Sequence, residues 1–245
     1  MNKNKISKIK YQKLNKLTVI LKKMGKVVVA FSGGVDSSLL LKVAVDSLGK
    51  EKVLAVTVRS PVHPEREYKE ARKLSRRLGI VHIAIKVDLL KNKRFLKNPF
   101  NRCFHCKKEI FSILKSSAEN RGFDFVIDGS NYDDRLDFRP GSYALKILNI
   151  RSPLKEARWT KRDIRAMARI YRLPNWNKLS QPCLVTRIPY YSKITRGKLR
   201  VIESSEDFLK NLGFRQIRVR YCADTARIET ACDEINKIAD LAIRD

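Results

Sequence analysis

Apolar runs alternate with amphipathic runs along the first half of the chain. The stretch KVVVAF at 26–31 is continuous and β-branched, which is typical of a strand buried on both faces of a parallel sheet. Strands are predicted at 26–31, 52–58, 81–87 and 123–128. Helices are predicted between them at 38–48, 65–78 and about 107–121. This alternation predicts an α/β fold with a doubly wound parallel sheet, whose ligands bind at the carboxyl ends of the strands.

Further helices are predicted on both sides of this series, and a smaller domain follows it. Residues 4–24 have helically spaced apolar positions among lysines, and 160–171 begins with a Thr cap three residues before Asp163. Beyond QPCLVTRIPYY the pattern predicts a helix at 195–212, strands at 214–221 and 225–230, and a helix at 231–243. The expected parts are a basic N-terminal helix (1–25), a doubly wound domain (26–188) and a small α+β domain (189–245) for substrate binding or oligomerisation.

The composition is that of an ordinary globular protein without a membrane span. The chain has 245 residues, 43% of them hydrophobic, and no apolar run approaches the roughly 20 residues that cross a bilayer. The N-terminal stretch is basic, but it has only LTVIL as an apolar core and lacks a small-residue cleavage site. We therefore expect a cytoplasmic protein whose cysteines stay reduced.

The net charge of +28 is the most unusual bulk property of the chain. No acidic residue precedes Asp36. Such a positive field attracts nucleic acid in a salt-dependent way. The excess is nevertheless spread along the whole chain, as it is where lysines are simply solvated. The charge alone leaves both interpretations open.

A glycine-rich turn, SGGVDSS at 32–38, connects the first buried strand to the following helix. Glycines let the backbone approach a ligand closely, and free N–H groups at a helix start favour phosphate. The Gly-Lys-Ser/Thr ending of a Walker loop is absent. A Ser-Gly-Gly turn alone could be a tight connection, but the whole string after a β-branched strand favours a phosphate-binding loop.

In this position SGGxDS resembles the PP-loop of the ATP pyrophosphatases, which cleave ATP between its α and β phosphates and attach AMP to a substrate oxygen. The resemblance implies that ATP and Mg²⁺ are cofactors and that 26–188 is the ATP pyrophosphatase domain. The loop residues implied in ATP binding are Ser32, Gly33, Gly34, Asp36, Ser37 and Ser38. Among them, Asp36 is expected to place the magnesium ion. Adenylation converts a poor leaving oxygen into AMP, a good leaving group.

Two cysteines, Cys103 and Cys106, lie in the basic stretch FNRCFHCKKEI. The neighbouring cations and the expected start of a helix both favour the thiolate form. A stable disulfide is disfavoured in the cytoplasm, and His105 is poorly spaced to complete a four-ligand zinc site. The pattern therefore favours a reactive pair, which suits an enzyme that activates an oxygen for replacement.

Five motifs narrow the family. In order along the chain, they are NPFNRCFHCKKEIF, VIDGSNYDDRLDFRPG, RSPLKEARWTKRDIRAMAR, LSQPCLVTRIPY and IRVRYCADTARIE. Over about residues 26–230 the chain resembles the LarE family of ATP-dependent sulfur transferases, which serve biosynthesis of the nickel-pincer nucleotide. LarE enzymes adenylate a carboxylate of a pyridinium bis-carboxylate mononucleotide and replace the activated oxygen with sulfur. Some sacrifice the sulfur of one cysteine, leaving dehydroalanine, and others hold a 4Fe-4S cluster on three cysteines.

The resemblance implies roles for particular residues. Cys183 stands at the position of the sacrificial cysteine, and together with Cys103 and Cys106 it matches the cluster type, so a 4Fe-4S cluster is an expected cofactor. Sulfide or another sulfur donor, a small-molecule nucleotide substrate and further copies of the chain are the expected partners. The residues implied around ATP are Ser60, Asp128, Gly129 and Arg187. Four more residues resemble family positions near the nucleotide and the metal: Asn131, Asp133, Asp134 and Arg139.

Arg218 and Arg220 alternate along the predicted strand IRVRY, so both point to one face. A pair of guanidiniums can hold a phosphate, and the resemblance implies that these two bind the phosphate of the substrate. The alternative is a solvated strand face. Cys222 and Cys232 match no cluster position and are interpreted as small apolar residues.

The main alternative function is tRNA thiolation by a PP-loop enzyme, which also uses adenylation and a three-cysteine 4Fe-4S cluster. The charge of +28 would suit RNA. An RNA-binding appendage would carry aromatic residues for base stacking, and the last 55 residues offer few. The LarE interpretation is therefore preferred.

Overall fold

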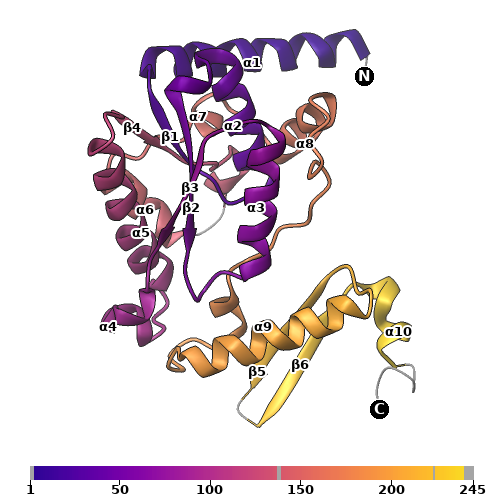
Figure 1. Cartoon of the computed structure of the whole chain (residues 1–245). Helices are drawn as coiled ribbons and strands as arrows, with labels where there is room; N and C mark the ends of the chain where they lie inside the picture. Colours follow the sequence, from indigo (N-terminus) through magenta and orange to yellow (C-terminus); the bar gives the residue numbers. More distant parts are fainter. Residues whose placement is uncertain (1–2, 137–138, 223, 240–245) are drawn as a thin grey trace. The chain divides into compact units, whose positions relative to one another are not determined.

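The computed structural model describes residues 3–136, 139–222 and 224–239, which form two compact units (Figure 1). The first unit comprises Met1–Ser60, Glu65–Val87 and Asn101–Ser180. The second unit comprises Pro61–Pro64, Asp88–Phe100 and Gln181–Asp245. The units interleave in sequence. The domain roles expected for 1–25, 26–188 and 189–245 stay predictions.

A four-stranded parallel sheet forms the centre of the first unit. Its strands are β1 (Val27–Ala30), β2 (Val53–Arg59), β3 (His82–Lys86) and β4 (Phe125–Ile127). They lie in the order β3-β2-β1-β4, and β1 pairs in parallel with both β2 and β4. The chain therefore moves outward from β1 to β3 and then returns to the other side of β1. The carboxyl ends of β1 and β4 flank this switch point, where open α/β sheets bind their ligands.

Helices cover both faces of the sheet. Figure 1 shows α2 (Val35–Leu48) and α3 (Glu65–Arg77) on one side, and α5 (Arg102–Glu119) and α6 (Pro140–Ile147) on the other. The predicted doubly wound parallel sheet is confirmed. Two helices begin earlier than expected: α2 starts directly after Gly34, its N-cap residue, and α5 starts directly after Asn101. The first helical turns therefore include the aspartate of the loop and both cysteines of the C-x-x-C pair.

The outer helices of the first unit are held by a capping box on one of them and by one buried indole. They are α1 (Lys3–Met24), α7 (Pro153–Glu156) and α8 (Lys161–Ile170). The cap expected at Thr160 is a complete capping box. Thr160 Oγ1 accepts a hydrogen bond from the backbone N–H of Asp163 at 3.2 Å, and the Asp163 carboxylate accepts one from the backbone N–H of Thr160, also at 3.2 Å. The fully buried Trp159 donates its Nε1–H to the carbonyl of Lys13 at 3.3 Å. This indole therefore joins α1 to the segment before α8.

The second unit is an α+β arrangement. Helix α9 (Arg196–Asn211) packs on an antiparallel hairpin of β5 (Ile217–Cys222) and β6 (Thr225–Thr230). The unit also contains α4 (Lys93–Leu96) and α10 (Ile235–Ala239), with 3-10 turns η2 (Leu89–Lys91), η4 (Leu184–Arg187) and η5 (Cys232–Glu234). The predicted helix at 231–243 is thus divided into η5 and α10, and its positions 240–243 lie outside the described residues. Two further 3-10 turns, η1 (Lys50–Lys52) and η3 (Asp133–Arg135), belong to the first unit.

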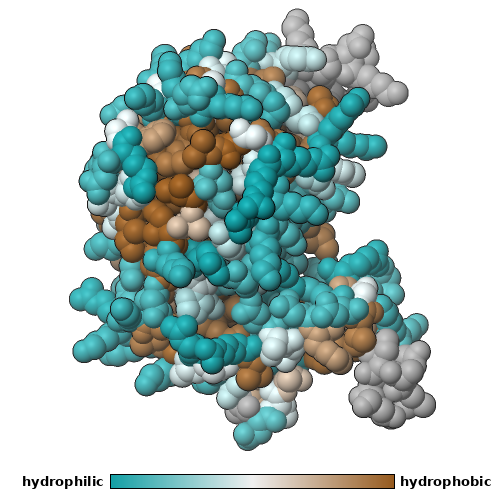
Figure 2. Space-filling view, in the orientation of Figure 1, coloured by the Kyte–Doolittle hydropathy of each residue, from teal (hydrophilic) through white to brown (hydrophobic). Residues whose placement is uncertain are grey.

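Basic side chains dominate the outer face of α3. Its exposed cations are Lys69, Arg72, Lys73, Arg76 and Arg77. Figure 2 shows this helix covered by hydrophilic side chains.

Among the described residues, no helix has the length and apolar character that crossing a membrane requires.

A buried ion pair joins three elements of the second unit. Arg187 and Glu206 each have a side chain that is 1% exposed, and Nε of the arginine lies 2.7 Å from Oε1 of the glutamate. The same Oε1 accepts from the backbone N–H of Val219 at 3.2 Å. Lys210 Nζ lies 3.8 Å from the other carboxylate oxygen. The carboxylate of Glu206 therefore holds η4, α9 and β5 together.

Replacing Glu206 with Gln should lower the free energy of unfolding by about 3 kcal/mol, because Arg187 would be left buried without its counter-charge. Glu203→Gln, at a half-buried position of the same helix, is the control and should change it by less than about 1 kcal/mol. Urea denaturation followed by circular dichroism measures both. Equal losses in the two variants would contradict a special role for the buried pair.

Candidate functional site

The loop of Ser32, Gly33 and Gly34 connects β1 with α2 at the switch point. Gly33 has φ of 72°, in the left-handed region, and a Cβ added to it would lie 3.0 Å from the Cβ of Ala71 on α3. Gly34 is the N-cap residue of α2 and gives it no side-chain cap. A helix start that is not capped in this way presents N–H groups and a positive dipole end to an anion.

Serine hydroxyls hold the loop in shape. Ser37 Oγ donates to the carbonyl of Gly34 at 3.1 Å and lies 3.1 Å from Ser32 Oγ. Ser38 Oγ donates to the same carbonyl at 2.8 Å. Ser37 and Ser38 are buried, whereas Ser32 is exposed. The contacts expected between these hydroxyls and phosphate stay predictions.

Asn175, for which the sequence predicts no role, also holds this loop. Its Nδ2 donates to the carbonyl of Gly33 at 2.9 Å and to Ser38 Oγ at 2.8 Å. Its Oδ1 is buried and has no hydrogen-bond partner among the described residues. Asn175 lies 142 positions from Gly33 and belongs to no recognised motif, so only the folded structure brings it to the loop.

Asp36 is held by Lys161, a second residue for which the sequence predicts no role. Lys161 Nζ lies 2.7 and 2.6 Å from the two carboxylate oxygens of Asp36, and Asn131 Nδ2 donates to one of them at 3.3 Å. Lys161 is the first residue of α8, where the helix dipole disfavours a cation. A lysine at the unfavourable first position of a helix is the sequence signal that could have identified Lys161.

Asp128 and Gly129 follow β4 directly and face the loop that follows β1. Asp128 is 6% exposed and accepts from the hydroxyls of Ser130 and Ser152, both at 2.5 Å. A Cβ on Gly129 would lie 2.9 Å from the backbone nitrogen of Ser37. The backbone after β4 therefore packs against the first turn of α2 at a distance that only glycine allows.

The two adjacent aspartates after this segment have specific partners. Asp133 accepts from the backbone N–H of Lys161 at 2.7 Å, which satisfies a free donor at the start of α8. Asp134 accepts from the N–H of Asn131 at 2.9 Å and pairs with Arg139 at 2.9 Å. These two aspartates therefore brace the segment that carries Asn131 toward Asp36.

Ser60 follows the carboxyl end of β2, on the same edge of the sheet. Its Oγ is buried and has no hydrogen-bond partner within the described part of the chain. A buried hydroxyl without a partner is costly unless a ligand or water satisfies it. This position fits the contact with ATP that the resemblance implies for Ser60.

The structure divides the three expected cluster ligands between the units. Cys103 and Cys106 are the second and fifth residues of α5, so they lie three positions apart on one face of the helix. Cys183 is the N-cap residue of η4, in the second unit. Within the described ranges no disulfide joins any two of the five cysteines, and no three His, Cys, Asp or Glu side chains gather where they could hold a metal. Two thiols on one helical turn are a suitable donor pair for an iron–sulfur cluster, and a cluster with Cys183 as third ligand stays a prediction.

Arg187 holds the segment around Cys183. Its guanidinium donates to the carbonyls of Pro182 at 2.7 Å and Cys183 at 3.1 Å, in addition to its pairing with Glu206. These contacts position the backbone at the cysteine. A contact between Arg187 and ATP stays a prediction.

Arg218 and Arg220 share one face of β5, as expected from their alternation with the buried Ile217 and Val219. Arg220 is paired with Glu229, and this hydrogen bond raises the pKa of the guanidinium above its usual value. Arg220 also donates to the carbonyl of Thr186 at 3.1 Å. Arg227 lies directly across the hairpin from Arg220, so it adds a third cation to the same face. Binding of phosphate there stays a prediction.

Comparison with known proteins identifies the family. Residues 10–116 match the NAD synthase family. The pyridinium-3,5-bisthiocarboxylic acid mononucleotide synthase of Lactiplantibacillus plantarum is 37% identical over 213 residues, which are 87% of this chain and 77% of that protein. The chain belongs to the LarE family. An uncharacterized protein of Synechocystis sp. is 39% identical to this LarE chain, over 92% of the chain and 84% of that protein. An uncharacterized protein of Methanocaldococcus jannaschii is 34% identical, over 93% of the chain and 87% of that protein.

Membership of the LarE family confirms the resemblance that the five motifs indicated. The loop between β1 and α2 lies within the segment that matches NAD synthase, which supports its interpretation as a PP-loop. This LarE chain is thus placed among PP-loop enzymes. The geometry brings Asp36, Asp128 and Asn131 to one edge of one sheet.

Gly129→Ala should weaken ATP binding to this LarE protein about tenfold, because the new methyl group would push the first turn of α2 away from β4. Gly197→Ala is the control, since its Cβ would meet only Thr195 Oγ1 at 4.0 Å. Isothermal titration calorimetry with ATP measures both variants. Unchanged ATP affinity in a folded Gly129→Ala protein would show that the close contact does not shape the loop.

Proposed function

We propose that this LarE protein is an ATP-dependent sulfur transferase. It adenylates a carboxylate of a pyridinium bis-carboxylate mononucleotide, releases pyrophosphate and replaces the activated oxygen with sulfur. The observation that carries the proposal is the glycine-rich loop at the switch point of the sheet, with Asp36 in the first turn of α2. The Lactiplantibacillus plantarum relative is named for a bisthiocarboxylic acid mononucleotide, the kind of product that such a replacement yields.

The first step is adenylation at the carboxyl edge of the sheet. The N–H groups of the loop and of the first turn of α2 bind the departing pyrophosphate, and Asp36 helps to place Mg²⁺. Lys161, which contacts Asp36, supplies a positive charge that can follow the phosphates once ATP and Mg²⁺ are bound. A carboxylate oxygen of the substrate attacks the α-phosphorus, the bond to the β-phosphate oxygen breaks, and pyrophosphate leaves.

Asp36→Asn should reduce formation of AMP and pyrophosphate by at least about 100-fold, because the carboxylate that places the metal is lost. Asp46→Asn is the control, since this residue lies near the other end of α2, where it pairs with Lys42. The products are separated by ion-exchange chromatography. Release of ADP and phosphate by the wild-type protein would sink the adenylation proposal.

Sulfur insertion depends on the cysteines. In the proposed form the thiolates of Cys103, Cys106 and Cys183 would hold a 4Fe-4S cluster, and the chemistry that such a cluster would supply is a source of sulfide for the acyl adenylate. The carbon–oxygen bond to AMP then breaks as the carbon–sulfur bond forms. The alternative is sacrifice of Cys183, which would transfer its own sulfur and become dehydroalanine. Arg187 would keep the backbone of Cys183 in place in either case.

Each of Cys103→Ala, Cys106→Ala and Cys183→Ala should lose bound iron and sulfur transfer together, because three ligands hold one cluster. Cys222→Ala and Cys232→Ala are the matched controls and should keep both. Protein purified without oxygen is assayed for iron and for its visible absorption. Intact-mass analysis after a single turnover decides the mechanism: loss of one hydrogen sulfide at position 183 would eliminate the cluster.

The second unit is proposed to bind the substrate. Arg218 and Arg220 would hold its phosphate, with Arg227 as a third cation on the same face. Glu229 already pairs with Arg220, so phosphate would compete with that carboxylate for one guanidinium. Assembly into a homo-oligomer is also proposed for this unit.

Thiolation of tRNA is the second candidate function, and the net charge of +28 favours it. The exposed cations on α3 would contribute to contacts with RNA phosphates. Both candidates use the same adenylation step and differ in the acceptor. Labelled sulfur that appears in tRNA, and not in the mononucleotide, would establish this second function.

A further inference from the structure

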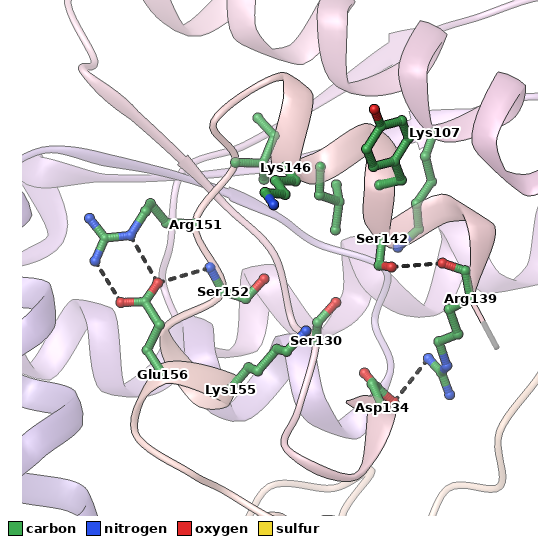
Figure 3. A pocket seen from close by; sticks show the side chains of 13 residues that line it. Lys107, Ser130, Asp134, Arg139, Ser142, Lys146, Arg151, Ser152, Lys155 and Glu156 are labelled. Atoms are coloured by element: carbon green, nitrogen blue, oxygen red, sulfur yellow. Dashed lines mark hydrogen bonds and ion pairs between the residues drawn. The ribbon is translucent and has the colours of Figure 1, made fainter. Parts of the chain in front are cut away.

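A hollow of about 420 Å³ lies in the first unit, separate from the PP-loop. Its walls come from α5, the segment after β4, α6 and α7 (Figure 3). None of the loop residues between β1 and α2 lines it. Its volume is within the range of about 300–1,000 Å³ that is typical of small-molecule sites.

The charged side chains around the hollow are strongly biased toward cations. The five cations are Lys107, Arg139, Lys146, Arg151 and Lys155, and the two carboxylates are Asp134 and Glu156. Each carboxylate is paired with an arginine: Asp134 with Arg139 at 2.9 Å and Glu156 with Arg151 at 2.5 Å. The three lysines are therefore left as the excess charge of the hollow.

The three lysines are positioned for an anion inside the hollow. Figure 3 shows their amines directed inward from three sides, while the guanidinium of Arg151 turns to Glu156 at the edge. Within the described part of the chain, the side-chain amines of Lys146 and Lys155 make no hydrogen bond or ion pair. In the same described ranges, the amine of Lys107 has only a long contact of 4.0 Å with the carboxylate of Asp128. Three amines of like charge that face one space repel one another unless an anion lies between them.

The rest of the wall consists of three serines and of apolar and aromatic side chains. Leu145 and Ile150 are buried beneath the hollow, and Tyr143 is 61% exposed at its side. Tyr143 stacks on Phe104 of α5 with ring centroids 5.8 Å apart. A Cβ on Gly141 would lie 2.7 Å from the side chain of Lys107, so close packing of α6 on α5 fixes this lysine at the wall. The site therefore offers three cations beside one aromatic ring and two apolar side chains.

We propose that this hollow binds the phosphate group of a small phosphorylated molecule whose other end lies against Tyr143. A phosphate monoester carries a charge of about −1.5 to −2 at neutral pH, which the three lysines would neutralise. Lysine suits this task because its amine is a point charge, so it can bind an anion that lacks the planar geometry of a carboxylate. The site is additional to the PP-loop and to the arginines of β5, and it does not depend on the proposed function.

Phenyl phosphate is the probe, because it combines a phosphate monoester with one aromatic ring. At constant ionic strength, Lys146→Gln and Lys155→Gln should each raise its Kd about tenfold, since each removes one charged hydrogen bond to the phosphate. Lys73→Gln, an equal change of charge on exposed α3, should leave the Kd within about twofold. Equal losses in all three variants, or no loss in any, would overturn the proposal.

Two further measurements on the wild-type protein complete the test. Phenyl phosphate should slow acetylation of Lys107, Lys146 and Lys155, as measured by mass spectrometry, and should not protect Lys73. Uniform protection would overturn the site. Benzene-1,3-dicarboxylate, a dianion without phosphate, should bind at least about tenfold more weakly, and equal binding would overturn the assignment to phosphate.

The result can be separated from that of the proposed function. ATP affinity and the formation of AMP and pyrophosphate are measured on the same Lys146→Gln and Lys155→Gln proteins. Both should match the wild type in the absence of phenyl phosphate, because the PP-loop does not line the hollow. A loss of ATP affinity equal to the loss of phenyl phosphate affinity would show that the hollow is part of the ATP site and overturn its independence.

Discussion

The close contact between Gly129 and the first turn of α2 is the constraint on which the rest of the site depends. Because this backbone lies against Ser37, the segment after β4 is held beside the loop after β1. Asn131 then reaches Asp36, and Asp133 reaches the start of α8, which presents Lys161 to the same carboxylate. Because Gly129 has no side chain, the polar residues that follow β1 and β4 can lie together at one edge of the sheet. A larger residue would separate the groups that the proposed adenylation needs together.

The long elements of this fold could be predicted because their signals are local. A β-branched run and a helical spacing of apolar residues depend on burial along one segment, so the sheet and the main helices followed from the pattern. The helix starts were harder, since α2 begins directly after Gly34, and a serine-rich turn does not show where helical geometry begins. Short helices such as α6 and α7 were not predicted, because one or two turns leave too little periodicity to recognise.

Only part of the candidate site could be predicted, because some of its residues are brought together by contacts between distant parts of the sequence. Asp36 lies in the loop after one predicted strand and Asp128 ends another, so topology alone places them at one edge. Asn175 and Lys161 reach the site through contacts across more than a hundred positions, and no local pattern encodes such a contact. The excess of positive charge was visible at once, but its concentration around one hollow depends on how α5, α6 and α7 meet.

The interleaving of the two units affects how the protein can be made and divided. The segments Pro61–Pro64 and Asp88–Phe100 are synthesised early, yet they belong to the unit that Gln181–Asp245 completes. Val62 accepts from the N–H of Leu184 at 2.9 Å, and Asn98 donates to the carbonyl of Pro189 at 2.7 Å. On the ribosome, these segments must therefore wait without their partners until the last part of the chain emerges. A single cut after Ser180 would leave their apolar side chains, such as Leu89 and Phe95, uncovered in the first fragment.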